Sequence, residues 1–532
     1  MRTGPRTRSR SRARSRTRAR TAVLTLALCV ATALPSPLTR ATEARQAATD
    51  AHVEGKLPSG AAYLMDVPAA WNGTVLLYSH GYRAAGWPNP AENAPSPETR
   101  ARLLARGYAL IGSSYATNGW AVTDAVPDQL ATLDLFTEKF GTARRTLAWG
   151  TSYGGLVTTR LAERHADRFD GSLSMCGLLQ GGVANWNSTL DPVFALKTLL
   201  APRTDIRLTG FADQAAARSA ADALTSKVTA AQQTPEGRAR IALAAALHRI
   251  PGHNDVAQAE PAPTDWDARQ ANQYAAVRGL LQFPAFSWRQ EAEHRAGGNP
   301  SWNTGVDYTA MLHRSPGYAE VSALYRKAGL SLGADLTALA RAPRISADPT
   351  AVRWMRHTSV LTGRLSDPQL TVHTTGDALI PVQSESAYRR AATAAGAGAL
   401  LSQAYVDRPG HCTFTPGEVL GALRTLEHRL DTGRWDTAPG MLNARARQED
   451  PTTEPRYARY RPGPYPRPYD LAHRGDTSAP VAGFLSPRPG PTAVAAADGS
   501  HAPTRASASA AVPPPCGGLP CQQAEAAQRR RT

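Results

Sequence analysis

Short apolar runs alternate with segments of helical period in the first third of the chain. The runs are rich in β-branched and aliphatic residues and end at glycine or small polar residues, which is typical of buried parallel strands. The predicted strands are Thr74–His80, Gly107–Ser114, Arg145–Gly150 and Phe169–Met175, and the predicted helices are Asp124–Lys139 and Gly154–His165. This alternation predicts an α/β fold, with a mostly parallel sheet flanked by helices.

The pattern changes between about Gly181 and Pro368. This stretch is rich in alanine and has the period of helices, with no convincing strand. Alternation then resumes with two further strands and two further helices, Gln369–Thr375, Gln383–Ala395, Leu401–Val406 and Pro416–Leu430. The middle stretch is therefore interpreted as a large helical cap inserted into the core.

Domain boundaries follow from these patterns. Residues 50–182 and 367–435 are predicted to form the two halves of the α/β core, and residues 183–366 the helical cap. Residues 436–470 contain several tyrosines and are expected to pack on the core as an extension. Residues 471–532 are rich in Pro, Ala, Arg and Ser, which predicts a disordered tail.

The net charge of +17 is concentrated near the two ends of the sequence. Residues 1–45 hold eleven Arg and one Glu, and residues 440–532 hold twelve Arg and seven acidic residues, so the middle is nearly neutral. A nucleic-acid groove needs Lys and Arg gathered on the folded surface, so no nucleic-acid partner is expected. The basic tail is either a weak contact with anionic cell-surface polymers or an inert linker.

The beginning of the sequence has the pattern of an export signal. An Arg-rich stretch, Met1–Arg20, precedes the apolar run Thr21–Leu34, which is too short to span a bilayer comfortably. Residues 1–42 are therefore predicted to be a signal peptide of a secreted, extracellular protein without a stable membrane anchor. The alternatives are a disordered basic arm and a true start codon further along the chain.

Gly150-Thr-Ser-Tyr-Gly154 is the strongest chemical motif. This G-x-S-x-G lies between a predicted strand and a predicted helix, the context in which a sharp turn exposes a serine hydroxyl above a sheet. Ser152 is therefore the predicted nucleophile. The alternative, a serine that caps a helix, leaves the two glycines unexplained.

A serine nucleophile needs an imidazole base and an acid that orients the imidazole, in the chain order Ser, acid, His. Asp377 follows a predicted strand directly, and His411 lies in the loop after the next one. These two residues are the predicted acid and base, with Asp367 and Asp407 as competing acids.

The oxyanion of an acyl-transfer intermediate needs main-chain donors. The predicted donors are the N–H groups of Tyr153, directly after the nucleophile, and of Tyr82, in the loop after the first core strand. No spaced His/Cys cluster suggests a metal, and no cofactor is predicted.

Together, these motifs over about residues 55–435 resemble the α/β-hydrolase superfamily. The pair His411-Cys412 is similar to the tannase and feruloyl esterase family, in which a cysteine after the catalytic histidine is bonded to one just before the nucleophile. Thr151 occupies that second place here, so the resemblance is partial.

Four cysteines remain after the predicted signal, which suits an oxidising compartment. Cys176 ends a predicted strand at the sheet edge of Cys412, so these two are expected to pair and to tether the His411 loop. Cys516 and Cys521 are expected to pair in the tail. The alternative for the first pair is two buried free thiols.

The sequence thus favours a secreted serine hydrolase that acts on a small-molecule or peptide acyl substrate, with a carboxylic ester preferred over a peptide. One alternative is a secreted peptidase or aminopeptidase, in which Glu291 or Glu293 would hold a substrate ammonium. The other is a binding module without catalysis.

Overall fold

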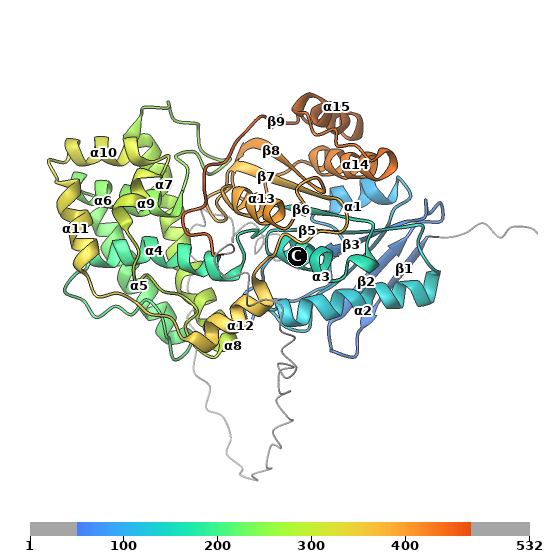
Figure 1. Cartoon of the computed structure of the whole chain (residues 1–532), viewed down its shortest axis with the longest axis horizontal. Coiled ribbons are helices and arrows are strands. Elements are labelled where there is room, and N and C mark those ends of the chain that lie inside the picture. Colours follow the sequence, from blue (N-terminus) through green and yellow to red (C-terminus); the bar gives the residue numbers. More distant parts are fainter. Residues whose placement is uncertain (1–49, 470–532) are drawn as a thin grey trace, which may run out of the picture. The chain divides into compact units, whose positions relative to one another are not determined.

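A computed structural model describes residues 50–469 of the chain. In that part, nine strands form one sheet in the order β1-β2-β4-β3-β5-β6-β7-β8-β9 (Figure 1). Strands β4, β3, β5, β6, β7 and β8 run parallel, whereas the β1–β2, β2–β4 and β8–β9 pairs are antiparallel. The strands are β1 (Ala51–Lys56), β2 (Ala62–Val67), β3 (Thr74–Ser79), β4 (Ala109–Ser113), β5 (Arg145–Thr151), β6 (Gly171–Met175), β7 (Gln369–Gly376), β8 (Leu401–Pro409) and β9 (Tyr457–Ala458).

The predicted α/β fold with a mostly parallel sheet is confirmed. Strands β1, β2 and β9 were not predicted from the sequence. The side chains of β1 alternate between half-buried and exposed, so this edge strand carries little hydrophobic signal. Strand β9 has only two residues and owes its pairing to β8.

Helices cover both faces of the sheet. One face packs against α2 (Val122–Phe140), α3 (Tyr153–Arg164) and α13 (Ser384–Ala394), with Phe136, Leu156 and Tyr388 in its apolar layer. The other packs against α1 (Pro97–Leu104), α14 (Pro416–Thr432) and α15 (Pro439–Glu449), through residues such as Leu103, Leu423 and Leu442. A parallel sheet needs such cover, because both faces of its strands are apolar.

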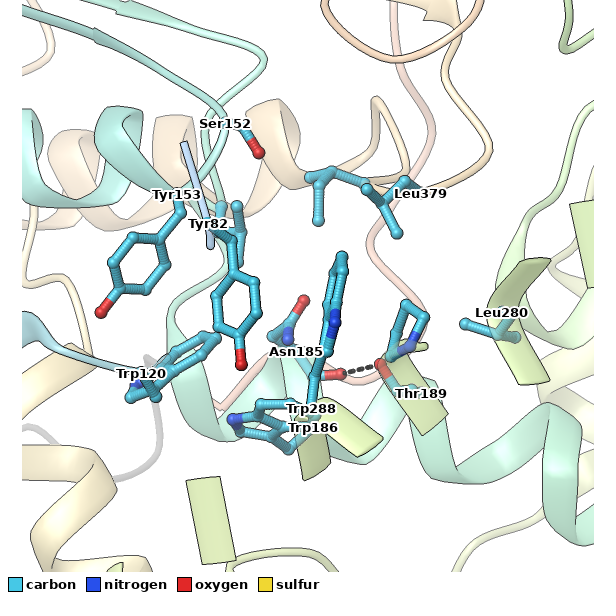
Figure 2. Close-up of a pocket in the computed structure, with 13 residues that line it drawn as sticks. Tyr82, Trp120, Ser152, Tyr153, Asn185, Trp186, Thr189, Leu280, Trp288 and Leu379 are labelled. Atoms are coloured by element: carbon cyan, nitrogen blue, oxygen red, sulfur yellow. Dashed lines mark hydrogen bonds between the residues drawn. The ribbon is translucent and has the colours of Figure 1, made fainter. Parts of the chain in front are cut away.

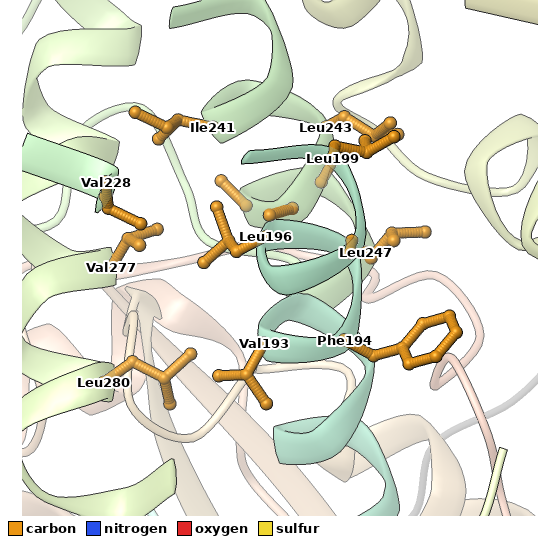
Figure 3. Packing of buried hydrophobic residues seen from close by; sticks show 14 of the residues in the cluster. Val193, Phe194, Leu196, Leu199, Val228, Ile241, Leu243, Leu247, Val277 and Leu280 are labelled. Carbon is orange, nitrogen blue, oxygen red and sulfur yellow. The ribbon is translucent and has the colours of Figure 1, made fainter. Parts of the chain in front are cut away.

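The inserted stretch between β6 and β7 forms a helical cap with a core of its own. Figure 3 shows Val193, Leu196 and Leu199 of the first cap helix packed among side chains of the next three. The cap elements are α4 (Gly182–Leu200), α5 (Gln214–Ala231), α6 (Pro235–His248), α7 (Trp266–Gln282), the short π-helix Pro284–Trp288, α8 (Arg289–Ala296), α9 (Tyr308–His313), α10 (Tyr318–Lys327), α11 (Leu332–Arg341) and α12 (Pro349–Ser359). None of the described helices is long and apolar enough to cross a membrane.

After β9 the chain returns to the cap (Figure 1). The Tyr465 hydroxyl lies 2.6 Å from Ser188 Oγ of α4, and Arg467 Nη1 donates to the buried carboxylate of Asp191, also in α4, at 3.1 Å. Burial raises the pKa of Asp191, and the charge of Arg467 opposes that effect. The extension therefore contacts the cap as well as the core.

We expect Arg467→Met to destabilise the protein by about 3–5 kcal/mol, because it leaves the Asp191 carboxylate buried without this cation. Unfolding in urea, followed by tryptophan fluorescence, measures the loss as a lower midpoint. The double variant Asp191→Asn/Arg467→Met removes both charges and should recover most of the stability. An Arg467→Met protein as stable as the wild type would contradict this assignment.

Candidate active site

Ser152 lies at a sharp turn between β5 and α3. Its backbone has φ of 57° and ψ of −123°, outside the regions that side-chain-bearing residues usually occupy. A Cβ atom at Gly154 would lie 1.9 Å from the Ser79 carbonyl oxygen, and one at Gly150 would lie 2.6 Å from the Gly154 oxygen. Both glycines are therefore required for this turn to pack against β3.

The structure brings the three predicted catalytic side chains into one hydrogen-bonded line. His411 Nε2 lies 2.7 Å from Ser152 Oγ, and His411 Nδ1 lies 2.6 Å from Asp377 Oδ2. The other Asp377 oxygen, Oδ1, accepts the N–H groups of Leu379 and Ile380, each at 2.9 Å. In this arrangement the acid fixes the ring of the base, and the base faces the serine.

The Asp377 carboxyl is buried yet ionised. Burial opposes its charge, but His411 and the hydrogen bonds from His411 and His373 hold its pKa at about 2. Neither competing acid shares this position: Asp367 lies before β7, at the opposite end of that strand, and Asp407 is exposed and accepts from Thr375.

The two predicted oxyanion donors belong to segments that meet at Ser152. Tyr153 is the first residue of α3, so its main-chain N–H has no intrahelical acceptor. A Cβ atom at Gly81 would lie 3.6 Å from Ser152 Cβ, so the loop that carries Tyr82 passes close to the serine. The role of these N–H groups stays a prediction.

Cys176 and Cys412 form the predicted disulfide, with their Cα atoms 5.5 Å apart. Cys176 follows β6 directly and Cys412 follows His411, so the bond ties the His411 loop to the end of β6. These two cysteines and His411 also form a cluster close enough for a metal, but the disulfide leaves no free thiol there. The predicted Cys516–Cys521 pair lies outside the described residues.

An apolar pocket opens at Ser152. Figure 2 shows Ser152 at one end of the pocket and the indoles of Trp120 and Trp186 at the other, with the Tyr82 ring between them. Core and cap share the lining, and none of the described residues that line it is charged: Tyr82, Trp120, Ser152, Tyr153, Leu178, Asn185, Trp186, Thr189, Leu280, Pro284, Trp288, Leu379 and Ile380.

The two cap carboxylates that were considered as ammonium ligands do not line this pocket. Glu291 is paired with Arg295 and accepts the main-chain N–H of Trp120 at 2.7 Å. Glu293 is buried near Arg289 and accepts the N–H of Gly210 at 2.8 Å. Glu291 therefore joins the cap to the core, Glu293 stays within the cap, and neither lines the pocket at Ser152.

Comparisons with known proteins agree with this geometry. The o-phthalyl amidase of Xanthobacter agilis is 31% identical to this chain over 428 residues, which cover 76% of this chain and 92% of the amidase. Residues 105–225, which include Ser152, match the prolyl oligopeptidase family. The chain belongs to the family of this amidase. It is thus a serine hydrolase of the α/β-hydrolase superfamily, as the motifs predicted.

Solved structures resemble this member of the amidase family only distantly. Feruloyl esterase B from Aspergillus oryzae matches with a TM-score of 0.37 and 12% identity, over 72% of this chain and 80% of its own. Another esterase from Aspergillus oryzae matches with a TM-score of 0.38 and 11% identity, over 73% and 80%. At these scores, neither likeness says anything about the substrate.

Two buried residues next to the triad were missed from the sequence. His373, in β7, lies between the carboxylates of Asp377 and Glu385, and all three side chains are inaccessible to solvent. A histidine within the apolar run Leu370-Thr-Val-His373 was a usable signal, because an ionisable side chain in a buried strand needs a partner. Glu385 gave no sequence signal that it is buried, because a glutamate in the first turn of an amphipathic helix such as α13 is ordinary.

We expect the Cys176→Ser/Cys412→Ser variant to lose roughly 2–5 kcal/mol of stability, because the disulfide closes a long loop. Its kcat should also fall, because the His411 loop loses its tether to β6. Urea unfolding and steady-state kinetics measure the two effects, and a reducing agent should reproduce them in the wild type but leave the variant unchanged. Equal activity and stability in the two proteins would refute the tethering role.

Proposed function

We propose that the protein hydrolyses amides and esters of aromatic carboxylic acids through an acyl-enzyme on Ser152. The observation that carries this proposal is the line Ser152–His411–Asp377 at the end of an uncharged pocket with aromatic walls. An acyl group bound there would present its carbonyl carbon to Ser152 Oγ while its ring lies among aromatic side chains.

The proposed reaction assigns a group to each step. Ser152 Oγ attacks the carbonyl carbon while His411 Nε2 takes its proton, and Asp377 stabilises the imidazolium that forms. The main-chain N–H groups of Tyr82 and Tyr153 would stabilise the oxyanion. His411 then protonates the leaving amine or alcohol, and water attacks the acyl-enzyme by the same route in reverse.

The proposal extends the preference for esters to amides. The relative's name describes an enzyme that acts on an amide of an o-phthalyl group, which is an aromatic acyl group. Tyr82, Trp186 and Trp288 line the pocket of this chain, so an aromatic acyl group suits both the pocket and the family.

An aminopeptidase is less well supported. Its substrate carries an ammonium group, which needs a carboxylate in the pocket, and Glu291 and Glu293 are engaged elsewhere. A non-catalytic binding module gains no support either, because its serine would not need an aligned base and acid.

We propose in addition that residues 1–42 direct export and are removed. The Cys176–Cys412 disulfide is compatible with this proposal, because such bonds persist in oxidising compartments. Mass spectrometry of the protein recovered from the culture medium should find a mature end near residue 42. Recovery of an intact Met1 end, with the protein confined to cells, would refute export.

The catalytic proposal is tested with a fluorophosphonate probe and a panel of chromogenic substrates. The panel contains benzoyl, phthalyl and acetyl p-nitroanilides, the matching p-nitrophenyl esters and an aminoacyl p-nitroanilide. We expect labelling of the wild type and a kcat/KM at least about tenfold higher for aromatic than for acetyl substrates, which is about 1.4 kcal/mol of transition-state binding.

Ser152→Ala should abolish labelling and lower turnover by about a thousandfold or more, because it removes the nucleophile. Trp288→Ala should raise KM for benzoyl but not for acetyl substrates, and Trp435→Ala, outside the pocket, is the matched control. An unlabelled wild type would refute the hydrolase. Preference for the aminoacyl anilide would replace the aromatic acyl proposal with an aminopeptidase.

A further inference from the structure

His373 contacts the triad acid from the side opposite to solvent. Its Nε2 lies 3.3 Å from Asp377 Oδ2, the same oxygen that His411 Nδ1 approaches at 2.6 Å. The same Nε2 also lies 3.0 Å from the carbonyl oxygen of Ile380. Two imidazole rings therefore converge on one carboxylate oxygen, one from the active site and one from the interior of the sheet.

Glu385 faces the other ring nitrogen of His373. Its Oε1 lies 3.2 Å from His373 Nδ1, and its Oε2 accepts the Thr371 hydroxyl and the Gln403 amide, each at 2.5 Å. These polar contacts fix the Glu385 carboxylate in a fully buried place. The chain thus aligns Glu385, His373, Asp377 and His411 in a single row.

The surroundings of His373 suit a protonated ring. A neutral imidazole has one N–H donor, whereas an imidazolium has two and can donate both to Glu385 Oε1 and to the oxygens near Nε2. Burial works against the positive charge, yet hydrogen bonds and charge from Asp377 and Glu385 raise the pKa of His373 to about 10. The two carboxylates therefore favour a positive charge on His373, on the buried side of the triad.

We propose that His373, held protonated by Glu385, is a positioning residue that fixes Asp377 and reduces the ease with which His411 takes up a proton. The proposal rests on the proposed function, because it assigns His411 as the base. His373 and Glu385 would form a buried pair behind the three residues that carry the reaction. The reaction itself does not use their charges.

The first effect of His373 is on the position of Asp377. His373 Nε2–H donates to the oxygen of Ile380, and the N–H groups of Leu379 and Ile380 hold Asp377 Oδ1. One imidazolium thus contacts both the carboxylate and the turn that carries it. The side chains of Leu379 and Ile380 also line the pocket, so the same ring supports one wall of the substrate site.

Charge is the second effect. A cation beside Asp377 offsets part of the negative charge that would otherwise favour an imidazolium at His411, because unlike charges a few ångströms apart in a buried site interact strongly. Glu385 is further from His411, with the His373 ring between them, so the cation dominates at the base.

Other ionisable groups around the row have different partners or lie further out. His248 of α6 has Nδ1 at 2.9 Å from the Ser188 oxygen, and burial lowers its pKa. Tyr388 and Tyr405 pack near Glu385, and burial raises the pKa of each, so neither carries charge at neutral pH. Arg389 donates to Gln403 and Tyr405. Of these groups, His248 is the one that senses Asp377: the negative charge of Asp377 opposes the lowering of the His248 pKa by burial.

The experiment compares pH profiles of kcat/KM for wild type, His373→Gln and His373→Gln/Glu385→Gln. The acidic limb reports protonation of the free enzyme's base. We expect it to move to higher pH by about one unit in both variants, since each lacks the cation beside Asp377. His165→Gln, which alters a half-buried histidine away from the triad, is the matched control and should leave the limb in place.

The double variant guards against misfolding, because it removes both buried charges at once and keeps two amides that can bond to each other. A role in folding alone would lower stability or kcat and leave the acidic limb unchanged in this variant. That result, or a shift to lower pH, would overturn the proposal.

Failure of the proposed function has a different signature. In that case the wild type itself shows no turnover that depends on Ser152, and Ser152→Ala behaves like the wild type. A wild type that is active, loses activity in Ser152→Ala, and has an acidic limb insensitive to residue 373 would instead leave the function intact and refute only the positioning role.

Discussion

The backbone of Ser152 is the constraint on which the site depends. A serine at φ of 57° is held in an unfavourable conformation, which persists only where the surrounding packing leaves no alternative. Here the close approach of Gly154 to the Ser79 carbonyl and the start of α3 at Tyr153 leave no room for another conformation of Ser152. The turn lifts Oγ clear of the sheet, where His411 can reach it. A larger residue at Gly150 or Gly154 would clash with neighbouring main-chain atoms and displace Ser152.

The order of the strands completes the site. β5, β6, β7 and β8 lie side by side and run parallel, and the segments after them carry Ser152, Cys176, Asp377 and His411 in turn. Because parallel strands end at one edge of a sheet, residues far apart in the sequence meet there. The disulfide then links the segment after β6 to the His411 loop across β7, which places the acid between two tethered segments.

The sequence was informative where local signals and chain order coincide. The nucleophile turn, the acid after a strand and the histidine after the next strand each combine a local pattern with a required order, and the structure brings all three together. The Cys176–Cys412 bond followed from their shared sheet edge. The edge strand β1 was missed because its side chains alternate between half-buried and exposed and carry little apolar signal. The residues that line the pocket could not be predicted from the sequence. They come from loops of the core and from cap helices, whose packing is set by long-range contacts.

The cap and the reacting centre are coupled through aromatic contacts. Tyr82, whose main-chain N–H is a predicted oxyanion donor, has its ring 4.5 Å from that of Trp288 in the cap and 5.8 Å from that of Tyr153. Tyr153 carries the other predicted donor and contacts Trp120, which in turn lies 5.2 Å from Trp186 of α4. The wall that would select an acyl group and the loops that would stabilise its oxyanion are therefore one packed layer. Because such layers resist small displacements, the same contacts would hold both the proposed acyl pocket and the proposed oxyanion donors in place.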